Sequence, residues 1–310
     1  MKKLLFFFSV LLFASPITPL VPVSYNKQQA LLGKMLFFDP VLSADNKISC
    51  ASCHSPSFSG ADNKRFSIGV FGRIDKPMNS PSVYNAVFNC RQFWNGRAND
   101  LKQQAIMAAH DFNEMGMSDD VLEKKINSIE KYKALFKKVY GVNYIKADLI
   151  YQSIAEFEKA LVTLDCRFDR YLKGDKKALN EDEKKGYYLF KVYGCITCHN
   201  GKNLGSNSFQ KLGIFIKDIN ITEGNDRYKV THKKSDRYVY KVPTLRNIAL
   251  TAPYFHDGSV KTLKKAIELM GKYNLGIEIP KEDVLYIEKF LKTLTGKTPL
   301  ILRGEYEEEK

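Results

Sequence analysis

The sequence predicts a mostly α-helical protein with long loops, divided into two domains of similar size. Apolar residues recur every three or four positions between Lys146 and Leu164, which places them on one face of a helix. The alternation typical of β-strands is scarce, and only Tyr238–Val242 fits a short strand. The pattern Cys-x-x-Cys-His occurs twice, at Cys50–His54 and at Cys195–His199, once in each half. This repeat predicts that each half folds around its own motif.

The composition is that of a globular protein. With 310 residues, the chain is long enough for one large domain or two ordinary ones. Hydrophobic residues make up 44% and charged residues 26%, which excludes a disordered chain. The formal net charge is +14, but the basic residues are scattered rather than clustered. We interpret the excess as a preference for anionic partners and predict no nucleic-acid binding.

The first residues have the features of a secretory signal. Lys2 and Lys3 precede the apolar run Leu4–Ala14, and prolines follow it. Eleven residues are too few for a helix that spans a membrane, which needs ~20. We predict a signal peptide at residues 1–22 and a mature protein in the periplasm. An uncleaved tether is the alternative, because the cleavage site lacks a clear small-x-small pattern.

Cys-x-x-Cys-His is the attachment pattern of c-type haem. Two cysteines three positions apart can each bond one vinyl group of the same porphyrin, and the adjacent histidine can then bind the iron. A zinc site shared by the two pairs is an alternative, but zinc ribbons are usually compact. A thioredoxin-like redox pair would need a βαβ context, which is absent. We therefore predict two cytochrome c-like haem domains, with two covalent haem c groups bound at Cys50, Cys53 and His54 and at Cys195, Cys198 and His199.

The predicted domain boundary lies where the helical pattern stops, in the segment Cys166–Asp175. It divides the mature chain into an N-terminal domain at residues 23–165 and a C-terminal domain at residues 166–310. Asn180 and Glu183 form a capping box before the second motif, and a last helix begins at Pro280 and ends at Gly296. A helix before the motif and another near the C-terminus would cross, as the chain ends of a small haem domain do.

Two cysteines, Cys90 and Cys166, lie outside both motifs. Outside the cytoplasm, thiols are normally oxidised or otherwise engaged. The sequence does not give the distance between these two, so a disulfide and a pair of buried free thiols both remain open.

Five further segments have a distinctive sequence: Leu32–Pro40, Asn79–Val83, Phe93–Arg97, Asn113–Gly116 and Lys241–Gly258. Together with the two motifs, they resemble the bacterial diheme cytochrome c peroxidases, from about Leu32 to Gly296. The resemblance implies an enzyme that reduces hydrogen peroxide, with a peroxidatic haem in the N-terminal domain and an electron-transfer haem in the C-terminal domain. It also implies Ca²⁺ where the domains meet, a small cytochrome c or cupredoxin as electron donor, and a homodimer.

The resemblance assigns roles around the first haem. His54 would bind the iron, Glu114 would move a proton between the two oxygens of peroxide, and Gln104 would be a second residue of this pocket. Trp94 would relay electrons between the haems. Without the resemblance, Glu114 would be a surface carboxylate and Trp94 a core residue. The family usually has Asp after this tryptophan, whereas this chain has Asn95, which removes a charge.

The resemblance also assigns residues around the second haem. His199 would be one iron ligand, and Met270, fourteen residues after His256, would be the other. Ligation by His and Met raises the haem potential, which suits a haem that receives electrons. His256 would lie near this haem. The calcium ligands would be the side chain of one residue and the carbonyls of two others, Asn79, Thr251 and Pro253.

The chain departs from the family in the loop after the first motif. Many members have a histidine there that binds the peroxidatic iron until the other haem is reduced, and this chain has Val70. No other histidine lies between His54 and His110. We predict a five-coordinate or water-bound peroxidatic haem that is active without reductive activation. His110 could reach the pocket, but a solvent-facing or core histidine is the favoured interpretation.

Two other functions remain open. An oxidase of a protein or organic substrate, like the methylamine-utilisation relative, also lacks that histidine, but it has Tyr where this chain has Met270. A non-catalytic diheme electron carrier would have two six-coordinate haems and would bind neither cyanide nor peroxide quickly. The presence of Glu114 favours an enzyme.

Overall fold

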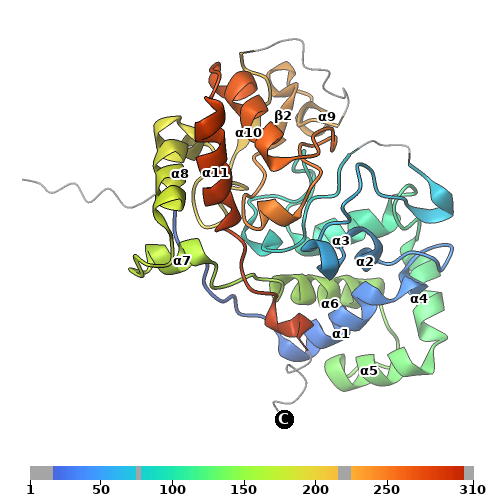
Figure 1. Ribbon diagram of the computed structural model, residues 1–310. Helices are drawn as coiled ribbons and strands as arrows, with labels where there is room; N and C mark the ends of the chain where they lie inside the picture. Colours follow the sequence, from blue (N-terminus) through green and yellow to red (C-terminus); the bar gives the residue numbers. More distant parts are fainter. Residues whose placement is uncertain (1–16, 75–77, 216–224, 304–310) are drawn as a thin grey trace, which may run out of the picture.

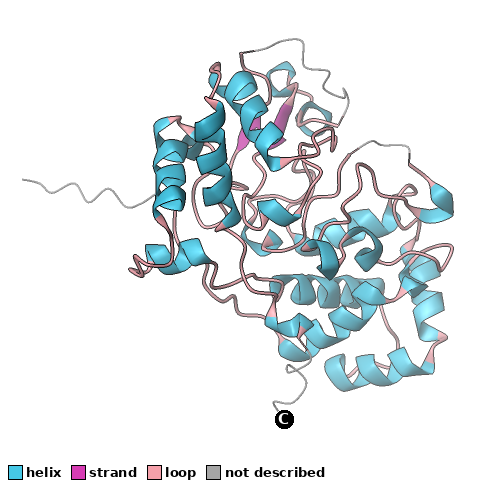
Figure 2. Ribbon diagram, in the orientation of Figure 1, coloured by secondary structure: helices cyan, strands magenta, loops and turns pink. Residues whose placement is uncertain are grey.

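The structure, a computed structural model, describes residues 17–74, 78–215 and 225–303. Residues 1–16, most of the predicted signal peptide, lie outside the described residues. The described chain is mostly α-helical with long loops, as predicted (Figure 2). Strands β1 (Phe209–Lys211) and β2 (Val239–Lys241) pair antiparallel, which confirms the predicted short strand. The helices are α1 (Lys27–Phe38), α2 (Cys50–Cys53), α3 (Leu101–His110), α4 (Asp119–Asn127), α5 (Glu130–Tyr140), α6 (Ala147–Lys159), α7 (Arg167–Leu172), α8 (Glu181–Val192), α9 (Tyr228–Thr231), α10 (Leu263–Met270) and α11 (Lys281–Lys292).

The helices form two groups that lie side by side (Figure 1). We call α1 to α6 the N-terminal lobe, and α7 to α11 with the two strands the C-terminal lobe. Each lobe has its own cluster of buried apolar side chains, centred on α1 and α6 in one and on α8 and α11 in the other. Each lobe also contains one Cys-x-x-Cys-His motif. The two motifs are therefore carried by two separately packed cores.

The same helix crossing occurs in both lobes. In the N-terminal lobe α1 packs on α6, and a Cβ at Gly33 would lie 1.9 Å from the carbonyl oxygen of Ser153. In the C-terminal lobe α8 packs on α11, and a Cβ at Gly186 would lie 1.9 Å from the carbonyl oxygen of Tyr286. Only glycine allows the helix backbones to approach this closely. In each lobe, the helix that precedes the motif thus crosses the last long helix, as expected for small haem domains.

The helix ends follow local chemistry, with two differences from the sequence prediction. The capping box of α8 is present, since Asn180 accepts from the backbone of Glu183 and Glu183 accepts in return. α6 ends at Lys159, and Leu161 stays buried in the extended segment that follows. α11 ends at Lys292 rather than at Gly296, since the backbone N–H groups of Thr293 and Leu294 bond three residues back instead of four. Gly296 instead allows a close approach to Thr163.

The two ends of the described chain cross between the lobes. Ile17, at 1% exposure, and Leu20 lie near the start of the described chain but are buried, and Ile17 belongs to the core of the C-terminal lobe. Ile301 lies near its end but is buried in the core of the N-terminal lobe. Figure 1 shows both connections, the blue segment before α1 and the red segment after α11. The start of the described chain thus packs in the C-terminal lobe, and its end packs in the N-terminal lobe.

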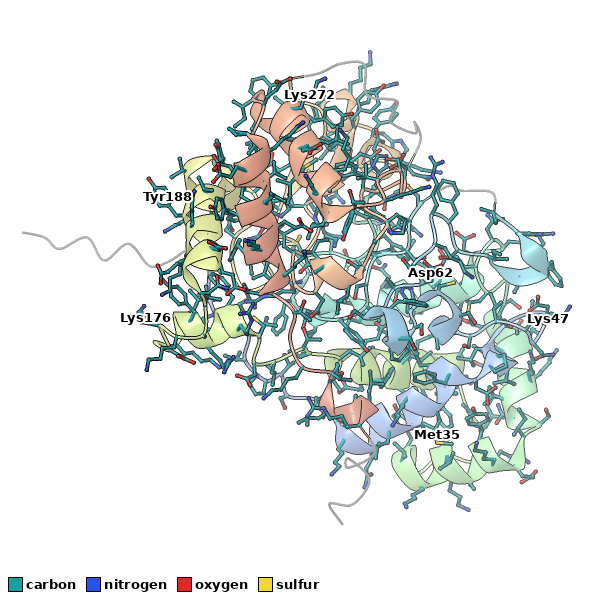
Figure 3. The ribbon with its side chains drawn as sticks, in the orientation of Figure 1. Met35, Lys47, Asp62, Lys176, Tyr188 and Lys272 are labelled. Atoms are coloured by element: carbon teal, nitrogen blue, oxygen red, sulfur yellow. The ribbon has the colours of Figure 1, made fainter. Side chains whose placement is uncertain are left out.

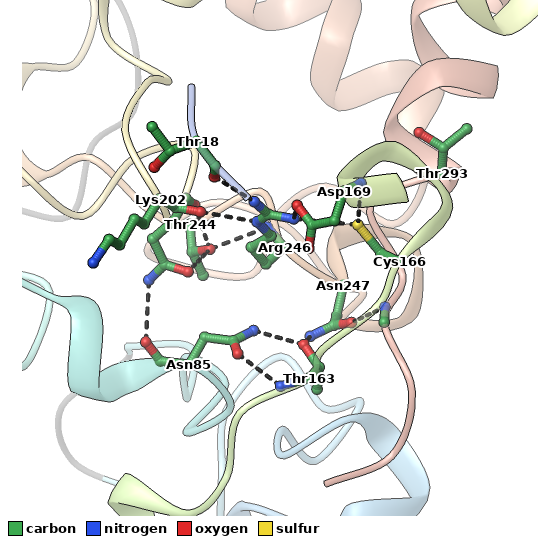
Figure 4. A network of polar contacts seen from close by, with 12 residues as sticks. Thr18, Asn85, Thr163, Cys166, Asp169, Lys202, Thr244, Arg246, Asn247 and Thr293 are labelled. Atoms are coloured by element: carbon green, nitrogen blue, oxygen red, sulfur yellow. Dashed lines mark hydrogen bonds and ion pairs between the residues drawn. The ribbon is translucent and has the colours of Figure 1, made fainter. Parts of the chain in front are cut away.

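A buried polar network joins the lobes (Figure 4). The side chain of Asn85 donates to the Thr163 hydroxyl and accepts from the Thr163 backbone. Asn247 also donates to the Thr163 hydroxyl, from the C-terminal lobe. Nearby, the buried Arg246 guanidinium lies 2.7 Å from the Asp169 carboxylate. Each charge offsets part of the cost of burying the other.

Cys90 and Cys166 are not bonded to each other. Both are free thiols, Cys90 exposed and Cys166 buried, so neither a disulfide nor a pair of buried thiols describes them. The Cys166 sulfur accepts from the backbone N–H of Asp169 and from Arg246.

Lysines such as Lys47, Lys176 and Lys272 project outward from the surface (Figure 3). Within the described residues, no helix is both long and apolar enough to cross a membrane.

Candidate haem sites

One cavity of about 560 Å³ extends through both lobes. Both cysteines and the histidine of each motif line it. In the first motif, α2 begins at Cys50 and ends at Cys53, so the two thiols lie one helical turn apart. The second motif follows α8 and forms a single 3₁₀ turn, Cys195–Thr197, which gives its thiols a similar spacing.

The two motif histidines are oriented in the same way. Nδ1 of His54 lies 3.1 Å from the carbonyl oxygen of Gly60, and Nδ1 of His199 lies 3.2 Å from that of Leu204. This leaves Nε2 of each ring available as a metal ligand, with the tautomer set by the carbonyl. Burial lowers the pKa of His54, and burial lowers the pKa of His199 to about 4. Both imidazoles are therefore neutral near pH 7, the form that binds iron.

The motif thiols do not resemble a zinc site. A zinc site of this type needs four Cys or His side chains gathered around one ion. Among the described residues, no three His, Cys, Asp or Glu side chains come together as a metal-binding group. The zinc alternative considered from the sequence is therefore not supported.

Several polar groups that line the cavity have no partner among the described residues. They are the hydroxyls of Ser206 and Tyr240 and both ring nitrogens of His256, which is 4% exposed. Buried polar groups are normally hydrogen-bonded, so these point to a ligand with polar substituents. A haem has an apolar ring that fits an apolar cavity, and its two propionates can accept hydrogen bonds from these polar groups. The residues present therefore fit a covalent haem in each lobe.

Met270 lies at the end of α10, where a π-turn, Gly271–Leu275, begins. It lines the cavity together with His199 and Ala266. Met270 therefore shares the cavity with the second motif, and its role as an iron ligand stays a prediction.

Glu114 and Gln104 line the same cavity in the N-terminal lobe. Gln104 is carried by α3, and Glu114 by the loop that follows it. The Glu114 side chain is 42% exposed and lies 3.7 Å from the Arg97 guanidinium. Arg97 in turn lies 3.3 Å over the ring of Phe93. The sequence analysis missed Arg97 as a site residue, although it belongs to the segment Phe93–Arg97 that carried the resemblance.

Two close backbone approaches hold the Glu114 loop. The backbone N–H of Val70 donates to the Glu114 carbonyl at 2.9 Å. A Cβ at Gly69 would lie 1.7 Å from the carbonyl oxygen of Asn113, so only glycine fits there. Val70 itself is 0% exposed and is not among the residues that line the cavity. Its side chain has no atom that could bind iron.

Trp94 contacts residues of both lobes. Its indole N–H donates to the carbonyl of Asn79 at 2.8 Å, and its ring lies edge-on to His256, with centroids 6.4 Å apart. His256 is stacked on Tyr240 at 4.4 Å. Next to Trp94, the Asn95 side chain accepts from the backbone of Arg97, so the neutral amide keeps a structural contact.

The three predicted calcium ligands, Asn79, Thr251 and Pro253, all line the cavity. Asn79 is 8% exposed, and its side-chain N–H donates to the carbonyl of Lys64 at 2.9 Å. Because its amide nitrogen is engaged, the side-chain oxygen is the atom left to face a cation. An amide oxygen with backbone carbonyls is the donor set of a hard cation such as Ca²⁺.

His110 does not line the cavity. Its side chain is 43% exposed and Nε2 lies 2.7 Å from Oδ1 of Asp119. The solvent-facing position favoured from the sequence matches this placement.

Similarity to known proteins supports the assignment of the two motifs as haem sites. A family model described as di-haem cytochrome c peroxidase matches residues 27–177. Cytochrome c551 peroxidase from Nitrosomonas europaea is 48% identical over 285 residues, which cover 92% of this chain and 85% of that protein. Cytochrome c551 peroxidase from Pseudomonas aeruginosa is 43% identical over 281 residues, covering 89% of this chain and 81% of that protein. A crystal structure of a MauG-like protein associated with microbial copper homeostasis matches with a TM-score of 0.82 at 26% identity, over 93% of this chain and 95% of that one. The resemblance seen in the sequence is confirmed: the chain belongs to the di-haem cytochrome c peroxidase family and is an enzyme of that family with two c-type haems.

Proposed function

We propose that the protein reduces hydrogen peroxide to water in the periplasm, with electrons from a small cytochrome c or cupredoxin. The observation that carries this proposal is the cavity that both haem motifs share, with Glu114 and Gln104 on the side of the first motif only. A carrier of electrons alone would need neither residue. Met270 stands against the oxidase alternative, which has Tyr at this position.

The residues of each lobe would hold one haem. Cys50 and Cys53 would bond the first porphyrin and His54 would bind its iron. In the C-terminal lobe, the same roles fall to Cys195, Cys198 and His199, with Met270 as the second iron ligand. Haem, when bound, supplies the iron that activates peroxide and the electrons that reduce it. The proposed division into domains at residues 23–165 and 166–310 is supported by the two apolar cores, except that Ile301 packs in the N-terminal core.

Glu114 has the role of proton carrier. Its carboxylate would take the proton from one peroxide oxygen and return it to the other, which must leave as water. Arg97, 3.7 Å away, would hold the carboxylate in place. Gln104 would orient the peroxide by hydrogen bonding. Trp94, which contacts both lobes, would pass the electrons from the C-terminal to the N-terminal lobe.

The peroxidatic site would be open in the fully oxidised enzyme. Val70 replaces the histidine that closes this site in many family members, and it is buried away from the cavity. Among the described residues, the histidines that line the cavity are His54, His199 and His256. His256 belongs to the C-terminal lobe and stacks on Tyr240 there. No reduction would therefore be needed to free the iron for peroxide.

We also propose Ca²⁺ at Asn79, Thr251 and Pro253, and a homodimer. Calcium would tie the loop of Asn79, whose carbonyl accepts from Trp94, to the C-terminal lobe. Titration of the chelated haem protein with Ca²⁺, followed by calorimetry, tests this site. Asn79→Ala is expected to remove the heat of binding.

The proposed activity is tested with the haem-loaded protein, hydrogen peroxide and a reduced cytochrome c551. We expect the absorption band of the reduced cytochrome to disappear only when both the enzyme and peroxide are present. Binding of cyanide to one haem in the oxidised protein is expected as well, because one iron is open. A protein that neither binds cyanide nor oxidises the cytochrome would be an electron carrier.

A further inference from the structure

A buried tyrosine in the N-terminal lobe has a proton acceptor beside it. The Tyr151 hydroxyl donates to Oδ1 of Asp119 at 2.7 Å, and Nε2 of His110 lies 3.4 Å from the same hydroxyl. The His110 and Tyr151 rings meet edge-on, with centroids 6.2 Å apart. The three residues come from α3, α4 and α6, which lie together in Figure 1. None of them has a role in the peroxide chemistry described above.

Tyr151 connects this cluster to the haem cavity. Tyr151 is 2% exposed, and it lines the cavity together with Ile154 and Glu158 from the same face of α6. By contrast, the side chains of His110 and Asp119 are 43% and 49% exposed. Tyr151 therefore forms part of the cavity wall, and its hydroxyl contacts groups that are open to solvent.

The protonation states of this cluster favour coupled loss of a proton and an electron. Burial, with the hydrogen bond to Asp119, raises the pKa of Tyr151, so the phenol does not ionise by itself. Burial alone would raise the pKa of Asp119, but the hydrogen bonds from His110 and Tyr151 hold it below its usual value. The carboxylate is therefore available as a base at the phenol. A tyrosine hydrogen-bonded to a base can be oxidised without forming a buried cation, which would be costly.

We propose that Tyr151 is an oxidisable residue that delivers one electron into the N-terminal haem cavity when no external donor is present. This inference rests on the proposed reduction of peroxide. Tyr151 loses one electron to the pocket, its O–H bond breaks, and the proton passes to Oδ1 of Asp119, which leaves a neutral tyrosyl radical. The electron is one of the two that reduction of hydrogen peroxide to water consumes, and the haem held by His54 would supply the other. Asp119 then exchanges its proton with His110 and solvent.

Tyr132 provides a matched comparison in the same lobe. It is 1% exposed, and its hydroxyl donates to Oδ2 of Asp39 at 2.6 Å. Burial and this hydrogen bond raise the pKa of Tyr132, as they do for Tyr151. Tyr132, however, is not among the residues that line the cavity. A structural hydrogen bond from a buried tyrosine to a carboxylate is thus common to both, and only Tyr151 adds contact with the pocket.

The experiment is rapid-freeze electron paramagnetic resonance of the haem-loaded protein mixed with hydrogen peroxide and no donor. Wild type is expected to give an organic radical whose spectrum narrows when ring-deuterated tyrosine is incorporated. Tyr151→Phe is expected to lose this signal, and Tyr132→Phe to keep it. Asp119→Asn keeps the tyrosine but cannot accept its proton, so the signal is expected to be lost or strongly reduced. Peptide mapping after prolonged peroxide is expected to find oxidation products at Tyr151 in wild type.

The outcomes separate this inference from the proposed function. If peroxide leaves the haem absorption of wild type unchanged, the proposed function itself is wrong. If the haem absorption changes but no tyrosyl radical forms, or if Tyr151→Phe keeps the radical, only the role of Tyr151 is wrong. Melting curves and haem spectra of both Phe variants show whether each has folded and bound haem.

Discussion

Replacing Arg246 by methionine would break the buried ion pair that anchors the loop of the second haem motif. The Arg246 and Asp169 side chains are 1% and 0% exposed, and their charged atoms lie 2.7 Å apart. The guanidinium also donates to the carbonyl of Lys202, three residues after His199, and to that of Thr18 (Figure 4). Because both side chains are fully buried, solvent does not screen the pair.

The expected cost follows from what is left behind. Arg246→Met leaves the Asp169 carboxylate buried without its counter-charge, and removing one partner of such a pair costs about 3–5 kcal/mol of unfolding free energy. In Arg246→Met/Asp169→Leu, both charges are gone, and the acceptors that lose a donor are the carbonyls of Lys202 and Thr18 and the weakly accepting sulfur of Cys166. The double variant is therefore expected to regain about 2 kcal/mol relative to the single one.

The assay is urea unfolding of the haem-loaded protein, followed by circular dichroism and haem absorption. Arg170→Met is the matched control, since Arg170 on α7 is 45% exposed and lies 4.0 Å from the exposed Asp175. We expect this control to change stability by less than about 1 kcal/mol. An Arg246→Met variant as stable as the control would show that the buried ion pair does not stabilise the fold. A double variant less stable than the single one would show that the unpaired carboxylate is not the source of the cost.

Three further predictions concern the site and the lobes. Glu114→Gln is expected to lower peroxide turnover by about 10²–10⁴-fold at unchanged haem absorption, whereas the exposed Glu130→Gln keeps it; near-normal turnover in Glu114→Gln would rule out the proton-carrier role. Gly186→Ala places a Cβ 1.9 Å from the Tyr286 carbonyl oxygen, whereas ordinary contact begins at 3.4 Å. The helices α8 and α11 must therefore separate, and we expect the free energy of unfolding in urea to fall by about 1–3 kcal/mol. An unchanged free energy of unfolding would mean that the crossing tolerates the added methyl group. Burial raises the pKa of Glu158 from 4.5 to about 8, so the folded protein keeps a proton that the unfolded chain loses, and wild type loses stability as pH rises through this window. The melting temperature of Glu158→Gln is therefore expected to gain on wild type between about pH 5 and pH 8, and a constant difference would contradict the shift.

Local sequence patterns predicted the elements that depend on local chemistry. The Cys-x-x-Cys-His motifs need only adjacent residues, and the capping box at Asn180 and Glu183 is a contact within one turn. The buried face of α6 follows from its spacing of apolar residues, although the helix stops at Lys159, earlier than the apolar pattern does. Leu161 stays buried beyond it because the extended segment crosses between the lobes.

Other features depend on residues far apart in sequence, and no local pattern reports them. Gly33 and Gly186 resemble ordinary helical glycines until the crossing helices are in place. Ile17 lies within the predicted signal peptide, yet it is buried in the core of the opposite lobe. The approach of Arg97 to Glu114, and that of Tyr151 to Asp119, joins segments whose distance only the folded chain sets.

We propose that the two haems differ in ligation, with Met270 closing one iron and with the other left open because Val70 stands where many family members have a histidine ligand. The most direct test is the electron paramagnetic resonance spectrum of the fully oxidised, haem-loaded protein. We predict one high-spin haem beside one low-spin haem with His/Met ligation, and immediate reaction of the high-spin haem with peroxide. Two low-spin haems that do not react with peroxide until one is reduced would contradict the account.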